Sequence, residues 1–313
     1  MRGAAFLAFA LTAFAQPNVD AGLARAAKSP YELARFVDSH EDFRLSALWK
    51  ALGIKPPNPF DIPCSEMEKC HLELITVVDP FQVIVQIDRR GQFHQFYYLR
   101  YMRVGTSGLW KFNGLFSAIS KYAEPYHRTD RIGKRTVLIV GHEVYQGFDW
   151  TIRKESWFDL TLSKFEPVFE FSPMKAHNGT PDPMIVFQSF GEVVEANESE
   201  FRVAYSMRFE LGQERPLLAV PMLAASAVYK RRDDRYEFDP AASSKMPAKD
   251  FDELYGFDLG PSTDFCVHLL LPDLKKVAQG SDGKRREWLG QFLREAGDTA
   301  EKRELMGMLA APR

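Results

Sequence analysis

The chain has 313 residues, of which 45% are hydrophobic and 13% aromatic, and this composition excludes an intrinsically disordered protein. Its 40 basic and 42 acidic side chains give a net charge of −2, and the two signs are interleaved along the sequence. This balance argues against nucleic acid as a partner, because binding to phosphates needs concentrated lysine and arginine.

The first 15 residues predict a cleavable signal peptide. Arg2 precedes an apolar stretch over residues 4–15, and Ala13-Phe14-Ala15 matches the small residues that signal peptidase accepts. The stretch is too short to cross a bilayer as a helix. We therefore expect a soluble protein, exported to the periplasm or the cell exterior, with no transmembrane segment in the mature chain.

Residues 16–63 predict an N-terminal helical segment. Ser29-Pro30 marks the start of one helix, and a second helix ends at Gly53, before a proline-rich linker. Cys64 and Cys70 follow, six positions apart, and in an oxidising compartment we expect them to form a disulfide. Their spacing does not match the common zinc or haem motifs, so no metal site and no cofactor is predicted.

Residues 64–240 predict an antiparallel β domain. Apolar and polar residues alternate with a period of two, most clearly over residues 201–211, and turn signals recur too closely for crossover helices. We expect a large antiparallel meander that forms a sandwich or a partly closed barrel. Residues 241–313 predict a C-terminal helical region that ends in a helical hairpin near Gly297. The predicted fold class is therefore mainly β (α+β).

Histidines that lie near carboxylates in the sequence are weak catalytic candidates. His127 precedes Asp130, and His142 precedes Glu143; a histidine beside a carboxylate supports acid–base chemistry or metal binding. On a regular strand, however, the members of each pair point to opposite faces. The alternative is that these histidines, like His94, are structural and are satisfied by their local surroundings.

A tryptophan among polar residues suggests a ligand-binding surface. If alternation runs without interruption through residues 148–160, Trp157 shares a polar face with Arg153 and Glu155. An exposed tryptophan in such surroundings stacks on a sugar ring or another flat ligand. A bulge near Glu155 would instead turn Trp157 into the core.

No motif in the sequence carries a strong catalytic signature, so the question of catalysis stays open. The leading hypothesis is a non-catalytic binding or structural module for a small-molecule, glycan or protein ligand. The alternative is a secreted hydrolase that uses a histidine and a carboxylate, with metal assistance as an option. A third hypothesis gives the C-terminal helices a docking role in a larger envelope assembly, through an exposed stripe at Trp288 and Phe292.

Overall fold

The structure is a computed structural model with two large antiparallel sheets and flanking helices, which confirms the predicted fold class. Among the described strands, neither sheet closes into a barrel. The predicted signal peptide lies outside the described residues. Those residues are 19–40, 42–57, 63–64, 70–76, 80–90, 94–105, 107–120, 125–146, 150–177, 185–212, 218–243, 254–256 and 262–311.

The first sheet has four strands in the order β3-β4-β5-β6, so each strand pairs with its neighbour in the chain. A two-stranded sheet of β1 and β2 precedes it. The bounds of these strands are β1 (Phe43–Arg44), β2 (Pro63–Cys64), β3 (Cys70–Thr76), β4 (Gln82–Arg89), β5 (His94–Val104) and β6 (Leu109–Ser120).

The second sheet has eight strands, again in chain order from β7 to β14, which confirms the predicted antiparallel meander. Alternation in β12 matches its burial, because Val203, Tyr205 and Met207 are buried and the residues between them face outward. The strands are β7 (Tyr126–Ile132), β8 (Arg135–Gln146), β9 (Trp150–Asp159), β10 (Phe169–His177), β11 (Ile185–Ala196), β12 (Glu200–Leu211), β13 (Leu218–Arg232) and β14 (Arg235–Phe238).

The chain divides into two compact units. Unit 1 comprises Met1–His142 and Trp157–Pro167, and unit 2 comprises Glu143–Ser156 and Val168–Arg313. These units do not coincide with the segments 16–63, 64–240 and 241–313 expected from composition, because each unit combines helices with strands.

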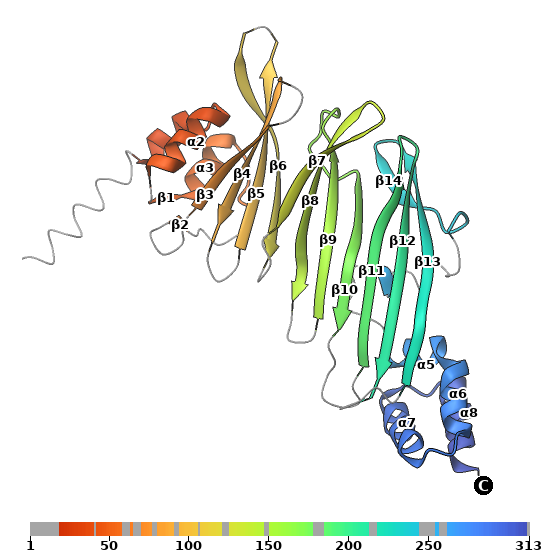
Figure 1. Ribbon diagram of the computed structural model, residues 1–313. Helices are drawn as coiled ribbons and strands as arrows, with labels where there is room; N and C mark the ends of the chain where they lie inside the picture. Colours follow the sequence, from red (N-terminus) through yellow and green to blue (C-terminus); the bar gives the residue numbers. More distant parts are fainter. Residues whose placement is uncertain are drawn as a thin grey trace, which may run out of the picture. The chain divides into compact units, whose positions relative to one another are not determined.

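In unit 1 the four-stranded sheet is covered on both faces. Helices α2 (Pro30–Ser39) and α3 (Leu45–Leu52) lie on one face, where residues such as Tyr97 form a common core with them (Figure 1). On the other face, Tyr98 belongs to a second core with Leu138 and Phe158. All eight residues of β4 are consequently buried. The sandwich predicted from sequence is therefore formed within unit 1.

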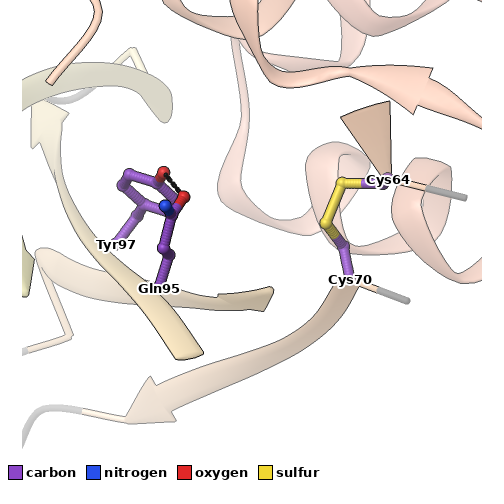
Figure 2. The surroundings of a disulfide bond; sticks show 4 residues. All are labelled: Cys64, Cys70, Gln95 and Tyr97. Carbon is purple, nitrogen blue, oxygen red and sulfur yellow. Dashed lines mark hydrogen bonds between the residues drawn. A yellow bond between two sulfur atoms is a disulfide. The ribbon is translucent and has the colours of Figure 1, made fainter. Parts of the chain in front are cut away.

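A disulfide joins Cys64 to Cys70, as the sequence predicts, with their Cα atoms 5.4 Å apart (Figure 2). Cys64 ends β2, which pairs with β1, and Cys70 begins β3 at the edge of the four-stranded sheet. The crosslink therefore ties the small β1–β2 sheet to the larger one. The third cysteine, Cys266, is buried and reduced.

A buried arginine holds the segment 157–167 against the four-stranded sheet. Arg100 is fully buried, and its Nε donates to Gln82 Oε1 at 2.9 Å. Its Nη1 and Nη2 each donate at 2.7 Å, to the carbonyl oxygens of Leu162 and Leu160. Gly114 lets the same segment approach closely, since a Cβ at that position would lie 2.7 Å from Phe165 Cβ.

In unit 2 the strands curl so that β14 contacts the start of β10. The amide of Tyr236 donates to the carbonyl oxygen of Val168 at 2.7 Å. Phe169 stacks on Phe201 with 4.3 Å between ring centroids, and Tyr229 meets Phe169 edge to face. These buried aromatic rings form the core at this end of the unit.

The C-terminal helices pack on one another, and the last two form the predicted hairpin. Thr299 caps the final helix by accepting a hydrogen bond from the amide of Lys302. Trp288 and Phe292 are buried, so the exposed stripe that the docking hypothesis requires is not formed. The helices are α5 (Thr263–Leu269), α6 (Leu271–Gln279), α7 (Gly283–Glu295) and α8 (Ala300–Ala310).

Candidate binding site

The exposed aromatic platform predicted at Trp157 is not present. Trp157 is 4% exposed and Glu155 is 5% exposed, and only Arg153 of the three lies on the surface. Strand β9 is buried on both faces from Glu155 to Asp159. Trp157 is therefore in the interior, with the guanidinium carbon of Arg128 6.0 Å from its ring centroid. The surface nominated from alternation alone was wrong, because that face of the strand is also covered.

The two histidine–carboxylate pairs do not come together either. Asp130 is exposed and its Oδ1 accepts a hydrogen bond from the amide of Arg131. Glu143 follows His142 directly on β8, so it points to the opposite face of the strand.

His127 instead meets side chains of the facing four-stranded sheet. Its Nε2 lies 3.8 Å from Glu73 Oε1, and its ring centroid lies 6.3 Å from that of Tyr98. His142 lies 5.9 Å, centroid to centroid, from Phe116, which is the cross-strand partner of Tyr98. Both histidines therefore lie over one aromatic pair in the interior of unit 1.

Around this aromatic pair, several buried polar atoms lack hydrogen-bond partners, although His94 Nδ1 lies 3.8 Å from Asp88 Oδ1, within ion-pair distance. Within the described ranges, no hydrogen bond reaches the Tyr98 hydroxyl, Gln86 Oε1, Asp88 Oδ1 or His94 Nδ1. Native interiors satisfy almost all such atoms, so a group of them in one place requires an explanation. An ordered water or a bound polar molecule supplies the missing partners in proteins.

The strand register places these atoms on one face of two neighbouring strands, β4 and β5, with Glu73 of β3 beside them. Gln86 lies directly opposite Tyr98 on one side and opposite Glu73 on the other. Asp88 and His94 have the same parity as Gln86 and Tyr98 on their own strands, so they share that face. We call this set the polar cluster; it consists of Glu73, Gln86, Asp88, His94, Tyr98 and His127.

The polar cluster carries two carboxylates in different surroundings. The side chain of Glu73 is 54% exposed, whereas Asp88 is 5% exposed and its Oδ2 accepts a hydrogen bond from Arg90 Nε at 2.7 Å. Burial raises the pKa of the Tyr98 hydroxyl well above its usual value, and the charges of Glu73 and Asp88 raise it further. Tyr98 is therefore a neutral hydroxyl at physiological pH, able both to donate and to accept.

The sequence singles out the histidines of the polar cluster but gives no sign that Gln86 and Asp88 of β4 belong to it. The polar residues Gln82, Gln86 and Asp88 alternate with apolar ones in β4, a pattern typical of a strand with one face in water. The interruption of that polar face by Ile84 was the one signal that the face is covered. Ile84 packs in the interior of the sandwich, between the two sheets.

Among the described residues, no three histidine, cysteine, aspartate or glutamate side chains are arranged to hold a metal ion. None of the helices in the described part of the chain combines the length and the apolar character needed to span a bilayer.

Comparison of the chain with known protein families, with curated proteins and with solved structures finds no match.

Proposed function

We propose that this chain is a non-catalytic binding protein that holds a small polar ligand at the polar cluster. The observation that carries the proposal is the group of buried atoms of Gln86, Asp88, His94 and Tyr98 without hydrogen-bond partners in the described residues. Each such atom costs about 1–3 kcal/mol if it stays unpaired. A bound polar molecule would recover this free energy, and the exposed side chain of Glu73 leaves the cluster open to solvent on one side.

Saturation-transfer NMR of the full chain tests the proposal. The probes are glucose, n-butyrate, n-butylammonium and inorganic phosphate, each measured against wild type and Tyr98→Phe. This substitution removes the hydroxyl and keeps the ring. We expect transfer to at least one probe from wild type and weaker transfer from the variant. Absence of transfer to all four probes, or equal transfer from both proteins, would contradict the proposed site.

Export through the N-terminal leader is part of the proposal. The leader pattern over residues 1–15 supports it, and the disulfide between Cys64 and Cys70 is compatible with an oxidising compartment. Expression of the full chain in a bacterial host, followed by fractionation and N-terminal sequencing, tests it. We expect a periplasmic product that starts at Gln16; a cytoplasmic product that retains Arg2 would contradict export.

A second candidate function, a secreted hydrolase, has one observation in its favour. The 3.8 Å separation of His127 Nε2 and Glu73 Oε1 resembles a base with a carboxylate that orients it. Hydrolysis of p-nitrophenyl acetate and p-nitrophenyl phosphate by wild type and His127→Gln tests this function. Turnover that His127→Gln abolishes would favour the hydrolase over the binding protein.

A further inference from the structure

We propose that the polar cluster binds the protonated amino group of a small organic ligand. This inference rests on the proposed binding function and names the class of ligand. It follows from three properties of the cluster: the kind of polar atom left without a partner, the spacing of those atoms, and the charge and aromatic rings around them.

The three oxygens among the atoms without hydrogen bonds call for a ligand that donates hydrogen bonds, since the fourth atom, His94 Nδ1, lies 3.8 Å from Asp88 Oδ1, too far to donate to it. Gln86 Oε1 and Asp88 Oδ1 can only accept, and neither receives a hydrogen bond from a described residue. The Tyr98 hydroxyl also offers lone pairs. A carboxylate or phosphate ligand has acceptor oxygens only and would leave Gln86 and Asp88 unsatisfied. An ammonium group carries three donors, one for each of these three oxygens.

The three oxygens come from neighbouring positions on two strands. Gln86 and Tyr98 are direct cross-strand partners, and Asp88 is two residues from Gln86 on the same face. Direct partners have Cβ atoms roughly 5 Å apart, and positions i and i+2 are roughly 7 Å apart. Side chains from such positions are close enough for their oxygens to reach a single –NH₃⁺ group.

Charge and aromatic rings in the cluster also favour a cation. Glu73 is the cross-strand partner of Gln86, and Asp88 lies two residues from Gln86 on the same face, so both carboxylates flank the position of Tyr98, with His127 3.8 Å from Glu73 and His94 3.8 Å from Asp88. Arg90 offsets part of the Asp88 charge from the other carboxylate oxygen, and its side chain is 54% exposed. The rings of Tyr98 and Phe116 line the interior face beside them, and aromatic faces attract ammonium groups.

Isothermal titration calorimetry of the full chain at pH 8 tests the ligand class. The probes have similar size and differ in the head group: n-butylammonium, n-butanol and n-butyrate. We expect saturable binding of n-butylammonium to wild type, and no binding of n-butanol or n-butyrate. Asp88→Asn and Tyr98→Phe should each weaken the binding of n-butylammonium at least roughly tenfold, the usual effect of losing a charged hydrogen bond.

Tyr97→Phe is the matched control. Tyr97 is also buried on β5 but points to the opposite face, where its hydroxyl donates to Gln95 Oε1 at 2.8 Å (Figure 2). We expect this variant to bind n-butylammonium as wild type does. If Asp88→Asn does not fold, as judged by circular dichroism, Tyr98→Phe carries the comparison, since the hydroxyl it removes has no hydrogen-bond partner among the described residues.

The outcomes separate this inference from the proposed function. Binding of n-butanol or n-butyrate that Tyr98→Phe weakens, without binding of n-butylammonium, would overturn the amine and leave a binding site. Binding of n-butylammonium that neither variant weakens would place the amine elsewhere on the protein and overturn the inference. Absence of binding of all three probes would overturn the inference as well, and the NMR panel then decides whether the cluster binds glucose or phosphate or only water.

Discussion

Replacing Arg100 by lysine should detach the segment 157–167 from the four-stranded sheet. Lysine keeps the charge but cannot direct donors to three separate acceptors as the guanidinium does. The Leu160 carbonyl also accepts from Gln82 Nε2 at 2.9 Å and keeps that hydrogen bond in the variant, so we expect the two acceptors at Gln82 Oε1 and Leu162 to lose the donor that the guanidinium supplies. At about 1.5–2 kcal/mol for each buried acceptor, the expected loss is about 3–4 kcal/mol.

Hydrogen exchange of the Leu160 amide measures this loss where it occurs. That amide donates to the carbonyl oxygen of Thr136 at 2.9 Å, so it exchanges only when the segment opens. A loss of about 3 kcal/mol corresponds to exchange faster by roughly a hundredfold or more. Local exchange is preferable to a global unfolding curve, because a chain with two units need not unfold in one step.

Arg103→Lys is the control, on the same strand. Arg103 is exposed, with its guanidinium carbon 5.9 Å from the Trp110 ring centroid, so its replacement should change stability by less than about 0.5 kcal/mol. If Arg100→Lys alters exchange at Leu160 by less than about fivefold, the hydrogen bonds of the buried guanidinium do not hold the segment. The apolar contacts of Phe158 and Phe165 would then carry that role.

Three other predictions concern stability. Replacing both Cys64 and Cys70 by serine should lower the free energy of unfolding by about 2 kcal/mol, as expected for a short loop, and dithiothreitol should then have no further effect in urea unfolding. Trp157→Ala should lower the free energy of unfolding by about 3–5 kcal/mol in thermal denaturation, because the ring is buried. A loss below about 1 kcal/mol would indicate that Trp157 lies at the surface. The free energy of unfolding should fall as the pH rises above about 10, by up to about 1.4 kcal/mol per pH unit for each buried tyrosine. The reason is that the unfolded chain loses its phenolic protons there, while burial keeps the pKa of these tyrosines raised in the folded protein. The tyrosines are Tyr97, Tyr98, Tyr101, Tyr205 and Tyr255, the last with its pKa raised to about 12. Absorbance at 295 nm checks the prediction, which fails if these residues ionise near pH 10 before the protein unfolds.

Local patterns in the sequence predict the elements of this fold well. Alternation predicts β12, Gly53 marks the end of α3 in the left-handed conformation with φ of 69°, and Ser29-Pro30 marks the start of α2. Each of these signals depends only on residues close together in the chain. The pairing of Cys64 with Cys70 is also local, since six positions separate them.

The candidate site depends on contacts between distant residues, and for this reason the sequence predicts it only in part. His127 was singled out for Asp130, three residues away, but it lies near Glu73 and Tyr98 on a different sheet. Trp157 was placed on an exposed face because alternation reports which face a side chain takes. Alternation does not report whether another layer of the protein covers that face.

The chain leaves unit 1 after residue 142 and returns to it for residues 157–167. A fragment that ends at residue 142 would keep helices α2 and α3 and all four strands of the four-stranded sheet. It would lack Phe158, Leu160 and Phe165, so water would reach Ile84 and Tyr98. A cut after residue 142 therefore does not release unit 1 intact. During synthesis on the ribosome, the first 142 residues expose an apolar surface that only residues 157–167 can cover. Fragments of this protein made for study should therefore end beyond residue 167, or the segment 157–167 should be supplied as a separate peptide.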